Sequence, residues 1–374
     1  MEKFNTVDLF CGAGGLSLGF EREGFNHVSA SDYQEDALNT YKENFPDVNT
    51  VLKDIRELEA SELLEGTKYS AEDIDAVIGG PPCKGFSMAG ERDPDDPRNS
   101  LFEEYIRIVS ELEPRVVVME NVKGILSMKD GAYVERILEE LRNLGYTVKH
   151  RVLNAADYGV PETRERVIWI GFKNGEKISF PEPTHHSDTE GQKKLGQSGN
   201  DDLKPYVTVG EAISDLDFLK SGEESSEYQK NPQSDYQKKM RENAGELLNH
   251  KASNHSERIQ KRFELMDEGK GMETVPEEHR TSKHSLQKFH RDEPSPTITT
   301  LPEDFVHYKR NRIPTVREVA RIQSFPDDHN FTGPRTTGGM RRREACPQYS
   351  QIGNAVPPLM AEAIAKEIRK SLES

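Results

Sequence analysis

The sequence predicts an α/β protein with a doubly wound sheet of mainly parallel strands, and three observations indicate this fold class. Short apolar runs alternate with segments of helical spacing over the first 172 residues. A glycine-rich turn at 11–15 follows the first apolar run. Polar residues directly follow several of the runs, and this is where open parallel sheets hold their ligands.

The first half of the chain carries these signals in regular order. The run Val116–Met119 is apolar throughout, which is typical of a parallel strand buried on both faces. The expected strands are 6–10, 27–31, 49–52, 74–78, 116–119, 147–153 and 167–172, and the expected helices are 18–23, 35–44, 101–112 and 133–144.

The composition changes after Phe180, where polar and charged residues dominate and periodic apolar content is low. It becomes globular again at Thr315–Gln323, an expected amphipathic helix, and ends in a helix at Leu359–Ser371. We therefore expect a large domain from residues 1–178 and 305–374, and a small loop-rich domain from residues 179–304.

Composition limits the classes of function. The net charge of −16 argues against a nucleic-acid partner, but local groups of Lys and Arg between residues 238 and 343 leave that class open. The sequence has no apolar run long enough to span a bilayer and no signal peptide pattern. Three widely spaced cysteines show no metal-site spacing and fit a reducing cytoplasm. We expect a cytoplasmic protein without metal.

The stretch Gly79–Ser87 (GGPPCKGFS) predicts a catalytic nucleophile. It follows an expected strand, and its glycines and prolines make a stiff turn that would hold Cys83 at the edge of a cleft. A buried structural cysteine is the alternative. A structural cysteine needs neither the stiff glycine–proline turn before it nor the polar residues 84–87 after it.

Other candidate residues stand at strand ends. Glu120 closes the buried strand beside the cysteine turn, and a solvent-facing acid is its alternative. Asp32 follows the second strand, where an acid can bond ribose hydroxyls or cap the next helix. Arg164 and Arg166 alternate with Glu165, so we expect both arginines on one face of a strand.

These stretches resemble the ordered motifs of DNA (cytosine-5) methyltransferases of the bacterial and archaeal type. The similar segments are 8–15 (DLFCGAGG), 80–83 (GPPC), 120–122 (ENV), 164–166 (RER), 317–327 (REVARIQSFPD) and 351–358 (QIGNAVPP). They cover the chain except the insert at 179–304. The resemblance implies a Rossmann-like methyltransferase domain and, in the insert, a target-recognition domain.

The resemblance implies S-adenosyl-L-methionine as methyl donor, with S-adenosyl-L-homocysteine as product. Phe10 would then stack on the adenine, Asp32 would hold the ribose, and Asp54 and Ile55 would contact the adenine ring. The full set of implied cofactor residues is Phe10, Gly12, Gly14, Gly15, Leu16, Asp32, Tyr33, Asp54, Ile55, Pro81, Leu101, Asn354 and Ala355.

The implied chemistry explains the catalytic residues. Carbon 5 of cytosine is a weak nucleophile, and addition of the Cys83 thiolate at carbon 6 makes an enamine that attacks the donor methyl. A free thiol has a pKa of about 8.5, so electropositive groups such as Arg164 and Arg166 would favour the thiolate. Glu120 would supply a proton at N3, and Arg166 would bond O2 and anchor Glu120. Water is the default base that removes the proton from carbon 5.

The family acts on a cytosine turned out of double-stranded DNA, and the insert would read the sequence. The loop after the cysteine would close over the base. Candidate DNA contacts are Ser87, Arg92, Arg98 and Thr297. Lys84 departs from the family, which more often has Gln or Asn after the cysteine, and it could lower the pKa of Cys83, contact phosphate or face solvent.

Three alternatives remain beside this interpretation. A tRNA methyltransferase of the same fold typically carries a Cys-Phe-Thr tripeptide, which is absent here. An inactive DNA-binding regulator predicts loss of Cys83 or Glu120, and both are present. A nicotinamide dehydrogenase leaves the cysteine and Glu-Asn-Val stretches unexplained. We expect a monomer in a restriction-modification or orphan modification system, acting apart from any cognate endonuclease and associated with the nucleoid when bound to DNA.

Overall fold

The computed structural model describes residues 3–82, 101–173, 175–187, 203–283, 285–336 and 345–374. Contacts divide the chain into two compact units. The first comprises residues 1–154, 165–182 and 358–374, and the second comprises 155–164 and 183–357.

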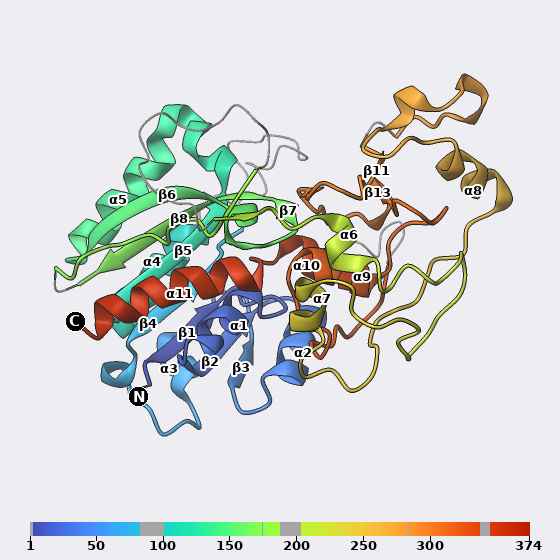
Figure 1. Ribbon diagram of the computed structural model, residues 1–374. Coiled ribbons are helices and arrows are strands. Elements are labelled where there is room, and N and C mark those ends of the chain that lie inside the picture. The colour runs from blue at the N-terminus through green and yellow to red at the C-terminus, as the bar shows by residue number, and fades with distance from the viewer. Residues whose placement is uncertain (1–2, 83–100, 174, 188–202, 284, 337–344) are drawn as a thin grey trace. The chain divides into compact units, whose positions relative to one another are not determined.

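The first unit is built on one seven-stranded sheet with the order β3-β2-β1-β4-β5-β8-β6 (Figure 1). Its strands are β1 (Asn5–Leu9), β2 (Asn26–Asp32), β3 (Asn49–Leu52), β4 (Ala76–Gly79), β5 (Val116–Val122), β6 (Thr147–Asn154) and β8 (Glu165–Phe172). The first five strands in this order, β3 to β5, pair in parallel, and β8 runs antiparallel to both β5 and β6. This sheet confirms the predicted α/β class.

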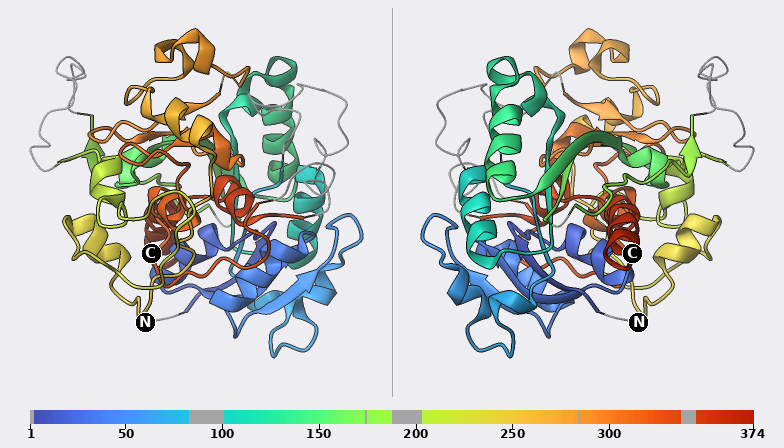
Figure 2. Two further views of the ribbon diagram at one scale, coloured as in Figure 1. Left: turned by 90° about the vertical axis from the view of Figure 1, so that its right-hand side faces the viewer. Right: turned by 90° about the vertical axis from the view of Figure 1, so that its left-hand side faces the viewer.

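Helices cover both faces of this sheet (Figure 2). Alternate strand residues such as Val7, Leu9, Val117 and Met119 share one apolar cluster with the buried side of α4. The opposite face carries α1 and α11 (Figure 2). The helical segments of the unit are α1 (Gly15–Arg22), α2 (Glu35–Asn44), α3 (Ala60–Leu64), η1 (Ala71–Asp73), α4 (Leu101–Leu112), η4 (Lys123–Gly131), α5 (Ala132–Asn143) and α11 (Pro358–Leu372).

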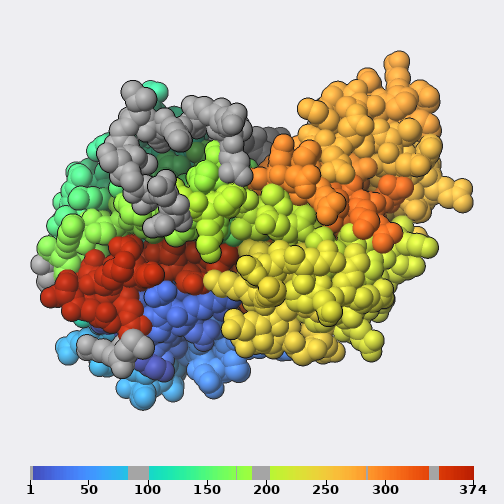
Figure 3. Space-filling view, viewed as in Figure 1, coloured from blue at the N-terminus to red at the C-terminus, as the bar shows by residue number. Residues whose placement is uncertain are grey.

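The two ends of the chain meet in this unit. Helix α11 packs along α1, and a Cβ atom on Gly19 would lie 2.4 Å from the Cβ of Ala361, so only glycine permits this approach. Arg369 on α11 donates to the carbonyl of Glu23 after α1. Figure 3 shows α11 in red against the blue N-terminal part. This unit is built from both ends of the chain.

The second unit has short elements joined by irregular segments, as its low periodic apolar content predicted. Its helical segments are η5 (Ala155–Tyr158), α6 (Val209–Ile213), α7 (Asp235–Met240), α8 (Glu257–Glu264), η6 (Met272–Thr274), η7 (Glu277–His279), η8 (Pro302–Asp304), α9 (Val316–Ile322) and α10 (Gln348–Asn354). Its two-residue strands are β7 (Glu162–Thr163), β9 (His185–His186), β10 (Lys204–Pro205), β11 (Gln287–Lys288), β12 (Ser295–Pro296) and β13 (Phe305–Val306).

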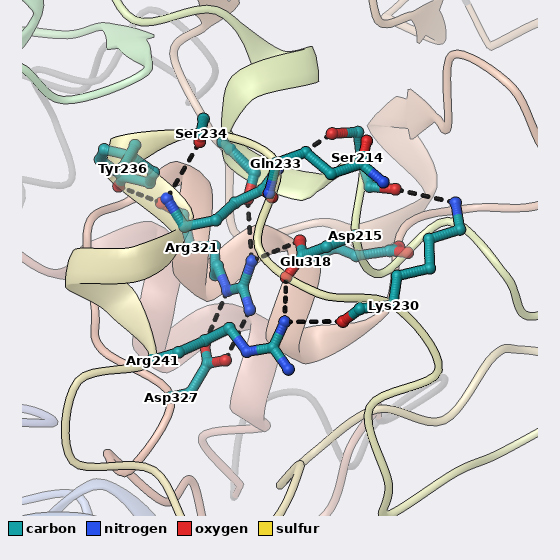
Figure 4. Close-up of polar contacts among 12 residues, drawn as sticks. Ser214, Asp215, Lys230, Gln233, Ser234, Tyr236, Arg241, Glu318, Arg321 and Asp327 are labelled. Atoms are coloured by element: carbon teal, nitrogen blue, oxygen red, sulfur yellow. Dashed lines mark hydrogen bonds and ion pairs between the residues drawn. The ribbon is translucent and has the colours of Figure 1, made fainter.

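A buried network of charged side chains stabilises the second unit (Figure 4). Arg321 on α9 is fully buried and binds Asp327 through two nitrogens, at 2.7 and 2.6 Å. Its third nitrogen lies 2.7 Å from Asp215, which also accepts a bond from Arg241 at 3.0 Å. Burial alone would raise the pKa of Asp327, but Arg321 lowers it below its usual value. Arg321 thus favours the charged form of Asp327 in the interior.

This network explains where the structure and the predicted boundaries differ. The start of the insert at residue 179 lies close to the observed boundary after Glu182. Residues 305–357, expected with the large domain, make their contacts in the second unit. Arg321 of α9 is satisfied by Asp215 there, a pairing that local periodicity does not reveal. The functional roles of the two domains stay a prediction.

Every helix among the described residues is too short or too polar to cross a membrane.

The buried network generates a stability prediction. We expect Arg321→Met to lower the free energy of unfolding by about 3–5 kcal/mol, because it leaves Asp215 and Asp327 charged and underpaired in the interior. Urea unfolding measures the loss. Lys261→Met is the control in the same unit, since Lys261 pairs with Glu264 at an exposed position, where such pairs contribute about 0–1 kcal/mol. Equal losses in both variants would contradict a stabilising role for the network.

Candidate active site

The glycine-rich turn after β1 forms one wall of the candidate site. Phe10 has a φ angle of 59°, a backbone conformation that residues other than glycine seldom adopt. Gly14 has a φ of 84°, and a Cβ there would lie 2.4 Å from the ring of Phe45. A Cβ on Gly12 would meet nothing within 4 Å, although its φ of 54° is positive. The outer side of the turn at Gly12 is therefore open to a ligand, and the inner side is tightly packed.

Asp32, at the end of β2, fixes this turn. Its carboxylate accepts the backbone N–H of Gly12 at 3.0 Å and that of Gln34 at 2.8 Å. Removal from water raises the pKa of Asp32, and these two bonds oppose that rise. The N-cap residue of α2 is Gln34, so Asp32 does not cap that helix itself, and its carboxylate instead fixes the backbone at Gly12 and Gln34. Ribose binding by Asp32 stays a prediction.

Several residues expected to hold an adenine belong to one apolar cluster. Ile55 and Leu101 are 6% and 9% exposed members of it, and Phe10 packs against it. Tyr33 is exposed at the neighbouring strand end, where a flat ligand could rest on its ring. The carboxylate of Asp54 binds the guanidinium of Arg56, which lowers the pKa of Asp54, and its contact with the adenine stays a prediction.

The turn that leads to the cysteine lies directly against the Glu-Asn-Val stretch. A Cβ on Gly80 would be 3.0 Å from Oε2 of Glu120, so glycine leaves room for the carboxylate. The side chain of Asn121 donates to the carbonyl of Pro81 at 3.0 Å. The candidate residues Cys83, Ser87, Arg92 and Arg98, and also Lys84, lie outside the described residues. Their roles stay predictions.

Glu120 and Arg166 form an ion pair near the carboxyl end of β5, where open parallel sheets bind their ligands. Nε of Arg166 lies 2.9 Å from Oε1 of Glu120, and both side chains are close to nine-tenths buried. The antiparallel register sets this distance, because Val122 on β5 faces Arg166 on β8 and Glu120 stands two residues earlier on the same face. The expected anchoring of Glu120 by Arg166 is observed.

Arg164 has different surroundings, and the placement of both arginines on one face stays a prediction. Strand β8 begins at Glu165, so Arg164 precedes it and belongs to the second unit. It is fully buried there and donates to the carbonyls of Gly353, Ala355 and Ile298 at 2.7, 3.1 and 3.1 Å. These bonds give it a structural role. Its catalytic role stays a prediction.

The remaining candidates also lie in the second unit. Asn354 is exposed at the end of α10, and Ala355 follows it with its carbonyl on Arg164. A Cβ on Gly353 would lie 2.4 Å from the carbonyl oxygen of Thr299, which explains the glycine there. Thr297 is exposed, and its hydroxyl donates to the carbonyl of Thr163 at 2.8 Å.

The sequence analysis missed a buried polar group beneath the glycine turn. Asp8 on β1 is 1% exposed and accepts a bond of 2.6 Å from the hydroxyl of Ser17 on α1. The hydroxyl of Tyr41 on α2 lies 2.9 Å from that of Ser17. Burial raises the pKa of Asp8 to about 8, so it is mainly protonated at neutral pH. The sequence did offer a signal, because Asp8 is an acid within an expected buried strand.

A second missed residue connects the strands that carry the site. The hydroxyl of Tyr105, buried on α4, lies 2.9 Å from the carbonyl oxygen of Val77 and 3.0 Å from that of Val118. It thereby bridges β4, which leads to the cysteine turn, and β5, which carries Glu120. Among the described residues, no group of three or more His, Cys, Asp or Glu could hold a metal ion.

Comparisons with known proteins agree with this geometry. Residues 4–370 match the family model of C-5 cytosine-specific DNA methylases. The chain is 41% identical to the Type II methyltransferase M.DdeI of Desulfomicrobium norvegicum, over 97% of this chain and 88% of that protein. It is 39% identical to the Type II methyltransferase M1.HphI of Haemophilus parahaemolyticus, over 97% of this chain and 86% of that protein.

A solved crystal structure gives the same result for the fold. It is that of a prophage-encoded protein (E. coli) to which DNA modification methyltransferase activity is ascribed, with a TM-score of 0.78 and 27% identity. The similarity covers 99% of this chain and 100% of the other. The predicted methyltransferase fold is confirmed by this similarity.

The protonated state of Asp8 generates a pH prediction. The folded chain keeps a proton on Asp8 between about pH 4 and pH 8, where the unfolded chain loses it. This carboxyl therefore lowers the free energy of unfolding as pH rises through that window, by up to about 1.4 kcal/mol per pH unit. Asp8→Asn removes the proton but keeps an oxygen for Ser17, so its stability relative to the native chain should increase with pH.

Urea unfolding at pH 5, 6 and 7 checks this prediction. Asp47→Asn, at an exposed carboxyl, is the charge-matched control. Stability curves of the native chain and Asp8→Asn that stay parallel across the three pH values would show that Asp8 is ionised in the folded chain.

Proposed function

Since the chain belongs to the family of C-5 cytosine-specific DNA methylases, we propose that it methylates carbon 5 of one cytosine in a specific sequence of duplex DNA. The methyl donor is S-adenosylmethionine, and the reaction passes through a covalent adduct between Cys83 and carbon 6 of the base. The observation that carries the proposal is the Glu120–Arg166 pair held against the Gly80–Pro81 turn, three residues before Cys83.

The first unit offers residues that fit the donor. The donor supplies an electrophilic methyl group on a sulfonium. The open side of the turn at Gly12 would accept its methionine part, and Asp32 has the position to accept bonds from ribose hydroxyls. The cluster that contains Ile55 and Leu101, with Phe10 against it, provides an apolar surface for an adenine.

Glu120 and Arg166 fit the needs of the base. When the thiolate adds to carbon 6, electron density moves toward N3 of the cytosine. A carboxyl group at N3 can donate a proton and relieve that charge. Arg166 fixes the orientation of Glu120 and has further N–H groups with which it can donate to O2 of the base.

Cys83 attacks as a thiolate, so its surroundings must favour the charged form. Its sulfur forms a bond to carbon 6, and carbon 5 then takes the methyl group from the donor. Loss of the proton from carbon 5, with water as the base, lets the carbon–sulfur bond break and regenerates the thiolate. The N3 proton returns to Glu120 as the carbon–sulfur bond breaks, and the net products are the methylated base, S-adenosyl-L-homocysteine and one proton.

The target carbon is stacked inside a DNA duplex, so the cytosine must leave the helix before Cys83 can reach it. Unpairing and unstacking cost about a few kcal/mol. We expect the second unit and the loop after Cys83 to provide compensating contacts and to read the sequence. A monomer that acts separately from any cognate restriction endonuclease is sufficient for this reaction.

Transfer of labelled methyl from S-adenosylmethionine tests the proposal. We expect label in unmethylated duplex DNA at one short sequence, located by bisulfite sequencing, and no label with Cys83→Ser. Label only in tRNA would assign the chain to the RNA-modifying alternative. Absence of label in both substrates, with DNA binding intact over a range of salt, would favour an inactive regulator.

The role of Glu120 gives a sharper prediction. Glu120→Gln keeps the shape of the side chain but removes its acidic proton, so kcat should fall by about 10²–10⁴-fold. Single-turnover methylation measures the chemical step. Glu165→Gln is the matched control, because Glu165 is an exposed neighbour that pairs with Lys123. Retention of more than half of the native rate by Glu120→Gln would remove Glu120 from the mechanism.

A further inference from the structure

The free edge of the sheet in the first unit contains a cavity that the methylation site does not use. Strand β6 is the last in the order, and no strand among the described residues pairs with its outer side. Beside it lies an open cavity of about 520 Å³, lined by Val148–Arg151 of β6, by Leu138 and Arg142 of α5, and by residues 178–180 and 182.

The cavity is positively charged in an acidic protein. Arg142, Lys149 and Arg151 line it, and Glu182 is the acid among the lining residues. In the described part of the chain, these three cations make no ion pair with a carboxylate within 4.0 Å, although the chain has 66 acids and 50 bases. Their charge is therefore available to an anionic partner.

Two of the polar side chains, although exposed, also contact aromatic rings. The guanidinium of Arg151 lies over the ring of Phe180, 4.9 Å from its centre. The ring of His150 lies 5.8 Å from that of Trp169, its cross-strand neighbour on β8. Ile178 and Val148, each 7% exposed, form apolar walls. The cavity thus combines preorganised cations with an apolar surface.

The strand edge adds a third feature. An edge strand offers backbone N–H and C=O groups to a further strand. Side chains alternate along β6, so Lys149 and Arg151 extend to one face of the sheet, while α5 with Arg142 covers the other. An added strand would therefore place its side chains beside a cation on either face.

We propose that this edge binds an extended acidic segment of a partner protein, which adds to the sheet as a strand next to β6. The backbone ladder would supply affinity, as in other cases of strand addition. Acidic side chains of the segment would meet Arg142, Lys149 and Arg151, and an apolar side chain would enter between Ile178 and Val148.

Other occupants fit these features less well. A second copy of the chain paired antiparallel through β6 would bring Lys149 and Arg151 against the same cations of its partner, which is unfavourable. Exposed cations on an edge strand commonly serve only to prevent aggregation. That role needs neither the stacking of Arg151 on Phe180 nor a cavity beside the strand.

Fluorescence anisotropy with the full-length chain tests the proposal. The probe is a labelled ten-residue peptide of alternating Glu and Val, compared with an alternating Lys and Val peptide and with a Glu–Val peptide N-methylated at every residue. We expect the Glu–Val peptide to bind at least tenfold more tightly than either comparison peptide, because one lacks the negative charge and the other cannot form the ladder.

Variants locate the binding and separate it from catalysis. Lys149→Glu/Arg151→Glu should weaken binding of the Glu–Val peptide at least tenfold, while its methyl transfer and melting temperature stay at native values. Lys42→Glu/Lys68→Glu changes the net charge equally at exposed positions of the same unit and should retain binding. Equal binding of the N-methylated peptide, unchanged binding by Lys149→Glu/Arg151→Glu, or full displacement by non-specific duplex DNA would each overturn the proposal.

Discussion

The antiparallel insertion of β8 between β5 and β6 is the constraint on which the candidate site depends. Because β8 starts at the edge where β5 ends, Arg166 near its beginning faces Val122 and reaches Glu120. A shift of one residue in this pairing would turn Arg166 to the other face of the sheet. The ion pair is therefore positioned by a backbone ladder, and mutual attraction of the charges only completes it. On the neighbouring strands β4 and β5, the hydroxyl of Tyr105 lies between the carbonyls of Val77 and Val118 and bridges the two strands.

The second unit relies on a different physical principle. Its short elements are joined by buried arginines as well as by apolar side chains. Arg321 joins α9 to Asp215 and Asp327, and Arg164 joins the carbonyls of Ile298, Gly353 and Ala355. Such interactions demand correct geometry, because each unpaired charge in the interior is costly. A unit of this kind can vary its outer loops widely while its polar interior stays fixed.

Sequence alone predicted the sheet and the helices around it, because apolar periodicity is a local signal and the first unit obeys it. Candidates at strand ends, such as Asp32 and Glu120, were found for the same reason. Sequence could not predict the partner of Arg164, since alternation with Arg166 suggests one strand face and β8 begins only at Glu165. It also missed Asp8 with Ser17, and the placement of 305–357, because these depend on tertiary pairing of distant residues.

The position of α11 has a consequence for how the enzyme is made in the cell. The ribosome synthesises this helix long after α1, yet it covers α1, which follows the glycine turn. Until residues 358–372 emerge, the face of α1 that receives Ala361 stays exposed to water, and the first unit is incomplete. A nascent chain stalled before this helix would carry every candidate catalytic residue and still lack a finished fold. Synthesis of α11 is therefore needed before the first unit can bury this face of α1.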